Sequence, residues 1–205
     1  MYIGLDIGTT TLSAVILDTE SGQLLAHQAT PNRAGIAPGP GRAELNMSRL
    51  AELTVECLTR IVTDSAIDPP SVRGIGVTGQ QHGVAFFNGA GLDGAGLDGV
   101  DTPARTAITW QDLRAQEMMP GSNQSYLHQL IQRAGGVEAF RRMGCVPAAG
   151  FLGTTLFWLR ENEELPSPPV TACFIPDAIV TFLTGARPAS DPTLAASSGL
   201  FDIIA

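Results

Sequence analysis

The sequence predicts an α/β domain in which helices flank a mixed β-sheet. Strand patterns open the chain as a meander, a long amphipathic helix pattern follows, and strand and helix patterns then share the rest of the chain. This order of elements is typical of α/β domains and differs from an all-β or all-helical chain. With 205 residues, 44% of them apolar, the chain can bury a substantial core as one large domain or two small ones.

The first part of the chain gives the clearest local signals. Three strands are expected, at Tyr2–Asp6, Leu12–Asp18 and Gly22–Thr30. The segment Pro31–Gly41 is rich in Pro and Gly and is expected to be a surface loop of the kind that often borders a site. Asn46 is suited to cap a helix that ends near Ser65, because apolar residues follow it at helical spacing.

The later elements alternate in type. Strands are expected at Arg73–Thr78, Val84–Phe87 and Arg105–Trp110. Residues 91–99 form a five-residue direct repeat rich in glycine, which we interpret as an insertion at a hairpin tip. Helical patterns follow at Asp112–Met119, Gln124–Ala134, Val137–Met143, Leu152–Glu163 and Asp177–Leu183, with one buried strand at Thr171–Ile175.

Composition argues against several classes of function. The net charge is −8 and no run of Lys or Arg is present, so nucleic acid is not an expected partner. The three cysteines form no CxxC pair and indicate neither a disulfide framework nor a zinc site. Because the chain has no signal-peptide pattern and no apolar run near the roughly 20 residues that span a bilayer, we expect a cytoplasmic protein without a membrane segment.

A first chemical motif lies where the first strand turns into the second. Gly8 permits a tight turn, and the backbone N–H groups and hydroxyls of Thr9, Thr10 and Thr11 can surround phosphate oxygens. Asp6 at the strand end can bind magnesium directly or through water. The alternative is a simple β-turn whose threonines serve strand propensity. No Walker loop or GxGxxG motif is present.

A second motif, Gly-Gln-Gln-His-Gly at residues 79–83, follows another predicted strand. The amide of Gln81 and the imidazole of His82 offer both donors and acceptors, which the hydroxyls of a polyol require once water is displaced. Alternatively, His82 is a structural residue with satisfied hydrogen bonds.

A third motif contains Trp110, Asp112 and Arg114. An indole can cover the apolar face of a sugar while a carboxylate accepts hydrogen bonds from its hydroxyls. The alternative is a core Trp with Asp112 as the N-cap of the next helix. Arg114 can bridge to Asp112 or lie in solvent.

Together these motifs resemble the amino-terminal domain of the FGGY carbohydrate kinase family, and the turn at residues 6–11 resembles the first phosphate loop of actin-like ATPases. Xylulokinases and sedoheptulokinases carry Gly-Gln-Met-His-Gly at the place of the second motif, where the pair matched by Gln81 and His82 contacts the sugar. Gln81 departs from the methionine of those kinases. Residues 150–162 resemble a segment typical of the family, with Thr155 where most members have lysine, and residues 175–202 resemble the last landmarks of its first domain.

The resemblance implies a ribonuclease H-like (actin-like ATPase) fold over residues 1–205, with ATP and Mg²⁺ as cofactors. It also implies several site residues: Asp6 for the metal, Gly8, Thr9, Thr10 and Thr11 for phosphate, and Gln81, His82, Trp110, Asp112 and Arg114 for the sugar. In this family a second, carboxy-terminal domain supplies the catalytic base and the adenine pocket, and we expect that domain to be absent from this chain. We therefore expect no catalytic base in this chain.

The expected function is half of an ATP-dependent kinase that phosphorylates a hydroxyl of a ketose similar to sedoheptulose or xylulose. The expected partners are the sugar and the missing carboxy-terminal domain or a partner chain, and the isolated chain is expected to show little or no turnover. Self-association through exposed apolar surface is a further hypothesis. The alternatives are another actin-like ATPase, such as an acetate kinase or a chaperone ATPase domain, and a non-catalytic sugar-binding or regulatory module.

Overall fold

A four-stranded mixed sheet forms the centre of the computed structural model, which describes residues 1–88, 106–166 and 170–202. The strand order is β3-β2-β1-β6, with β1 antiparallel to β2 and parallel to β6. These strands are β1 (Tyr2–Ile7), β2 (Thr11–Asp18), β3 (Gln23–Pro31) and β6 (Ile75–Gly79). The predicted mixed sheet is therefore confirmed. The glycine-rich repeat at residues 91–99 lies outside the described residues.

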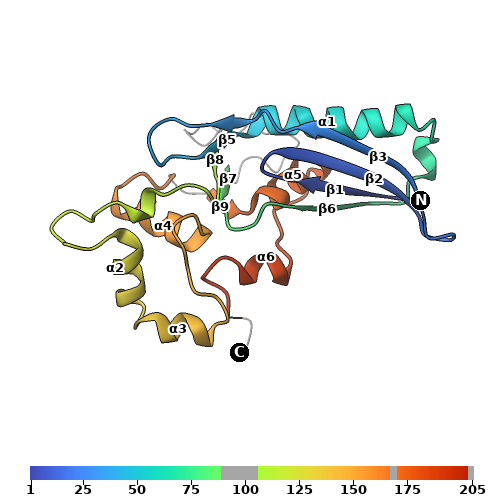
Figure 1. Cartoon of the computed structure of the whole chain (residues 1–205). Helices are drawn as coiled ribbons and strands as arrows, with labels where there is room; N and C mark the ends of the chain where they lie inside the picture. Colours follow the sequence, from blue (N-terminus) through green and yellow to red (C-terminus); the bar gives the residue numbers. More distant parts are fainter. Residues whose placement is uncertain (89–105, 167–169, 203–205) are drawn as a thin grey trace.

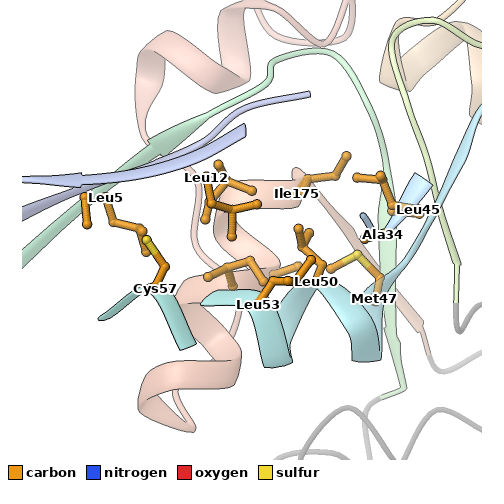
Figure 2. Packing of buried hydrophobic residues seen from close by; sticks show 14 of the residues in the cluster. Leu5, Leu12, Ala34, Leu45, Met47, Leu50, Leu53, Cys57 and Ile175 are labelled. Carbon is orange, nitrogen blue, oxygen red and sulfur yellow. The ribbon is translucent and has the colours of Figure 1, made fainter. Parts of the chain in front are cut away.

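One face of this sheet packs on the long helix α1 (Met47–Asp64) (Figure 1). Alternation along β1 buries Ile3, Leu5 and Ile7 on this face, as the period of a strand requires. Leu50 and its helical neighbours point from α1 toward the strands (Figure 2). Burying one such aliphatic side chain stabilises the fold by about 1.5–3 kcal/mol. The Asn46 side chain accepts a hydrogen bond from the Arg49 N–H at 2.9 Å, which confirms the predicted cap.

The remaining strands form two small sheets instead of extending the central one. One sheet has the order β4-β5-β8, and the other pairs β7 with β9. Their bounds are β4 (Gly35–Ile36), β5 (Glu44–Asn46), β7 (Ala85–Asn88), β8 (Thr106–Ile108) and β9 (Val170–Cys173). The strands predicted at Val84–Phe87 and Arg105–Trp110 thus exist in shortened or shifted form, whereas β4 and β5 were not predicted because Pro and Gly dominate that segment.

Helix α5 (Ile175–Thr184) packs against β6 and α1, whereas the helical segments of residues 114–161 gather at the end of the sheet away from the N-terminus (Figure 1). They build a second core around Tyr126, Trp158, Leu159 and Phe174. Within the described residues, no helix is both long and apolar enough to cross a membrane. The short helices of the chain are η1 (Pro69–Ser71), η4 (Arg114–Gln116), α2 (Tyr126–Arg133), α3 (Val137–Arg142), α4 (Leu152–Glu161), α5 (Ile175–Thr184) and α6 (Pro192–Ala196).

One predicted helix is wrong, and one predicted strand ends earlier than expected. The helix expected at Asp112–Met119 is a single 3-10 turn, because Glu117 already has extended backbone angles (φ −60°, ψ 149°). The buried strand expected at Thr171–Ile175 ends at Cys173, and Ile175 begins α5. Pro176 and Asp177 favour a helix start here, since proline suits the first turn and the Asp177 carboxylate accepts from the Phe174 N–H at 3.2 Å.

Candidate functional site

The turn between β1 and β2 is tight and is supported from outside. The Gly8 N–H donates to the Thr11 carbonyl at 3.0 Å. A Cβ atom on Gly8 would lie 2.6 Å from the same oxygen, so this position requires glycine. The Asn32 side chain donates to the Gly8 carbonyl at 2.8 Å, and the Asn32 N–H donates to the Thr10 carbonyl at 2.8 Å. Sequence reasoning missed Asn32, which lies inside the segment interpreted as a surface loop.

The second motif leaves the sheet beside this turn. Ile7 at the end of β1 pairs with Gly79 at the end of β6, and the Gln80 N–H donates to the Ile7 carbonyl at 3.0 Å. A Cβ atom on Gly79 would lie 2.7 Å from that carbonyl. Because β1 and β6 are parallel, their carboxyl ends meet at one edge, which is where ligands bind in many α/β sheets. Gln81 is exposed at this edge.

His82 has a fixed and unusual conformation. Its backbone lies in the left-handed region (φ +72°), which is rare for a residue with a side chain. The imidazole Nδ1 lies 3.0 Å from the Ser197 carbonyl oxygen, and the ring stacks on Phe151 with a centroid distance of 3.8 Å and an interplanar angle of 7°. Strained backbone of this kind occurs where surrounding contacts over-determine it, and such positions cluster at sites.

Trp110 connects the third motif to the first. Its side chain is 47% exposed, and its indole Nε1 donates to the Thr9 hydroxyl at 3.1 Å. Gly150 lies directly against the Trp110 backbone, since a Cβ atom there would come within 2.0 Å of the Trp110 carbonyl. The next residue, Phe151, is the one that stacks on His82. Residues 150–151 therefore contact both Trp110 and His82, a role that sequence reasoning did not assign to Phe151.

Asp112 and Arg114 form a buried ion pair. The Asp112 carboxylate is fully buried and accepts from Arg114 Nε at 2.8 Å, Arg114 Nη2 at 3.0 Å and the Ala43 N–H at 2.9 Å. Burial by itself would raise the pKa of Asp112, but these hydrogen bonds outweigh burial and keep the pKa below its ordinary value. Of the two alternatives for Arg114, the bridge to Asp112 is the one present. Arg114 also pairs with Glu44 at 2.7 Å.

This ion pair lies beneath the surface, whereas Gln81 and Trp110 are exposed on it. The two oxygens of Asp112 are already used by protein donors, and the Arg114 N–H group also donates to Asp112 at 2.9 Å. That last bond resembles the capping role weighed for Asp112, although the helix ends after one turn. The structure thus brings Trp110 and Gln81 next to the turn at residues 8–11, holds the neighbouring His82 through Phe151 and Ser197, and buries Asp112 and Arg114 as an ion pair.

Asp6 is the candidate ligand for a metal ion. Its side chain is exposed at the end of β1, and within the described part of the chain no residue hydrogen-bonds to its carboxylate. Among the described residues no group of three or more His, Cys, Asp or Glu side chains could hold a metal by itself. Magnesium commonly keeps several waters and binds one or two carboxylates together with substrate phosphates, so a single free carboxylate fits this mode.

Comparison with known proteins identifies the family and the fold of the chain. The sequence profile of the FGGY family of carbohydrate kinases, N-terminal domain, matches residues 1–205. The chain therefore belongs to the FGGY family of carbohydrate kinases and corresponds to the N-terminal domain. The fold is that of the sugar kinases with an actin-like ATPase fold: the xylulose kinase from Rhodospirillum rubrum superposes with a TM-score of 0.76 at 23% identity, over 98% of this chain and 37% of that one.

Curated relatives carry several sugar kinase names. Human sedoheptulokinase is 32% identical over 221 residues, covering 98% of this chain and 42% of that protein. Xylulose kinase of Streptomyces rubiginosus is 29% identical over 187 residues, covering 90% of this chain and 34% of that protein. Autoinducer-2 kinase of Escherichia coli (strain K12) is 24% identical over 201 residues, covering 98% and 35%. The chain thus spans between a third and just over two fifths of these relatives' length.

Proposed function

We propose that this chain is the sugar-binding half of an ATP-dependent kinase whose complete form transfers the γ-phosphoryl group of ATP to a hydroxyl of a ketose. The observation that carries the proposal is the hydrogen bond from Trp110 to Thr9, which joins the phosphate turn and the sugar motif at one edge of the sheet. Phosphoryl transfer needs donor and acceptor placed side by side, and this edge offers groups for both. The names of the relatives favour a ketose similar to sedoheptulose or xylulose.

Each residue has a proposed role. The turn at Gly8, Thr9, Thr10 and Thr11 binds phosphate oxygens through the threonine hydroxyls and the remaining backbone N–H groups, while Gly8, whose own N–H donates to the Thr11 carbonyl, gives the turn its shape. Asp6 would hold Mg²⁺ through water, and a bound Mg²⁺ would neutralise phosphate charge.

On the sugar side, Gln81 and His82 exchange hydrogen bonds with hydroxyls, and Trp110 covers an apolar face of the ring or chain. Asp112 and Arg114 have an indirect role. Their ion pair bonds residues 112–114 to Ala43 and Glu44 and so positions Trp110.

The other half of the proposal concerns proton transfer. The sugar hydroxyl must lose a proton, and we propose that the base comes from a carboxy-terminal domain, or from a partner chain that takes its place. A coupled ADP-release assay on the 205-residue chain should show little or no sugar-dependent turnover. Robust turnover by this chain alone would show that it carries its own base.

Calorimetric titration with sedoheptulose and with xylulose tests the sugar site separately. We expect binding of at least one of them, weakened about tenfold or more by Trp110→Ala, because a stacked aromatic contributes large contact area. His82→Asn should also weaken binding, because the hydrogen bonds of its imidazole are lost. His128→Asn, a substitution at an exposed position on α2, is its matched control and should leave affinity unchanged. Absence of binding to every ketose would refute the proposed site, and binding without turnover in the complete protein would favour a sugar-binding module instead.

A further inference from the structure

The imidazole of His82 is oriented by two contacts that together define its chemistry. A backbone carbonyl oxygen can only accept a hydrogen bond, so the Nδ1 atom that lies 3.0 Å from the Ser197 carbonyl must carry the proton. In a neutral imidazole the other nitrogen, Nε2, is then an acceptor. We infer that His82 presents an unprotonated Nε2 to the ligand, which makes it a receptor for a hydroxyl group and not for a carbonyl oxygen. This inference rests on the proposed sugar site.

The Nε2 atom is available for that role. No described residue hydrogen-bonds to it, and it is not among the buried side-chain atoms that lack a partner. The parallel stack on Phe151 fixes the plane of the ring, so that Nε2 can move little within the site. Phe151 is therefore a positioning residue for His82.

The Ser197 carbonyl reaches His82 because the turn after α6 packs closely against the start of α4. The Gly153 N–H donates to the Ser198 carbonyl at 3.0 Å, and a Cβ atom on Gly153 would lie 2.9 Å from that oxygen and 2.8 Å from Leu200 Cγ. Glycine at residue 153 thus lets the turn after α6 lie against the start of α4. The same turn supplies the carbonyl that determines the tautomer of His82. These contacts explain two segments, residues 150–153 and 197–200, to which the proposed function assigned no role.

The consequence for substrate selection is specific. A ketose has one carbonyl and several hydroxyls, and only a hydroxyl can donate to Nε2. Losing a neutral hydrogen bond of this kind lowers the affinity for a sugar by a modest factor. The loss is larger when the atom left without a partner is buried. His82 would therefore select against a sugar that turns its carbonyl toward this position.

Nitrogen NMR of the uniformly labelled 205-residue chain tests the tautomer directly. We expect His82, assigned by the signal lost in His82→Gln, to show a protonated Nδ1 and an unprotonated Nε2 at a pH where the ring is neutral. A protonated Nε2, or an equal mixture of the two tautomers, would overturn the inference. Because this measurement needs no ligand, it can fail or succeed independently of the proposed function.

Phe151→Leu tests the positioning role, with Phe157→Leu as control, since Phe157 packs edge-on against Tyr126 and not against His82. We expect Phe151→Leu to move the His82 signals toward a tautomer mixture and to weaken xylulose binding about fivefold. The control should change neither. Equal effects of the two substitutions on the His82 signals would overturn the role of Phe151. If neither xylulose nor sedoheptulose binds the unsubstituted chain, the proposed function fails while the tautomer result still decides this inference.

Discussion

At the scale of single residues, the ion pair between Asp112 and Arg114 is the group whose charge state should affect the free energy of unfolding most. Both side chains are buried, and each satisfies the hydrogen-bonding groups of the other. Two aromatic contacts add to this, because the guanidinium of Arg114 lies 5.3 Å and that of Arg42 lies 4.7 Å from the centroid of the Trp158 ring. Removing one member would leave the other charge buried and incompletely paired.

Asp112→Asn should lower the free energy of unfolding by about 3 kcal/mol at pH 7, measured by urea denaturation. The pKa of Asp112 is lower in the folded chain than its ordinary value of 3.8. The stabilisation is therefore fully present above that value and is lost as pH falls through the lower pKa of the folded state. The difference between the two proteins should shrink below about pH 4.

Asp64→Asn serves as control, because Asp64 is exposed at the end of α1. It should change stability by less than about 0.5 kcal/mol at either pH. A cost of Asp112→Asn that is the same at pH 3 and pH 7 would contradict the pH dependence.

Gly150→Ala is the second prediction at this scale. The new Cβ atom would meet the Trp110 carbonyl at 2.0 Å, so the backbone of one segment must move. We expect a loss of about 1–3 kcal/mol in the free energy of unfolding and a changed fluorescence of the exposed Trp110. Gly76→Ala is the control, because nothing lies within 4 Å of the corresponding position in β6. Unchanged stability and fluorescence in Gly150→Ala would show that Gly150 and the Trp110 backbone lie farther apart than the structure indicates.

At the scale of elements, the packing of α1 on the central sheet contributes much of the first core. Leu50 is fully buried between the helix and the strands (Figure 2), whereas Val55 on the same helix is 45% exposed. Leu50→Ala should therefore lower the free energy of unfolding by about 2–5 kcal/mol in chemical denaturation. Val55→Ala should change it by about 0.5 kcal/mol or less. Similar costs for the two substitutions would contradict the burial pattern of α1.

Elements also determine how precisely the site is built. The turn between β1 and β2 is anchored on one side by the pairing of Ile7 with Gly79, and on the other by Asn32 after β3. Because rigid strands support it from both sides, the turn is held in one shape, as the proposed binding of phosphate would require.

At the scale of the whole molecule, apolar side chains gather where the described chain ends. Leu200 is 58% exposed, Phe201 45% and Val146 45%, and a Cβ atom on Gly199 would lie 3.5 Å from the Pro147 Cβ atom, so the two segments lie close together. Contiguous exposed apolar surface of this kind marks interaction sites. We propose that a second copy of the chain covers these side chains in solution.

Sedimentation at increasing concentration should therefore reveal weak self-association of this chain. Replacing both Leu200 and Phe201 with Ser should weaken it about tenfold, because two apolar anchors are lost. Leu24→Ser, at a 62% exposed position on β3, is the control and should leave association unchanged. A clean monomer at all concentrations would contradict the proposal for this chain.

The sequence by itself predicted what depends on local pattern. The meander, the cap at Asn46, the helix to residue 64 and the return strand of the central sheet all follow from periodicity and turn chemistry within a few residues. The motifs at residues 6–11, 79–83 and 110–114 were visible for the same reason, since each is a short run with its own chemistry. The family followed from their order along the chain.

The tertiary structure decided what depends on contacts between distant residues. The bond from Trp110 to Thr9 joins residues 101 positions apart, and the contact of His82 with Ser197 joins residues 115 apart. Local periodicity carries no information about such pairs, nor about the burial of Asp112, whose carboxylate is paired with Arg114 and with the Ala43 N–H. Packing determines which donor meets which acceptor. Only the tertiary structure therefore decided the strand order, the stack of Phe151 on His82 and the tautomer of His82.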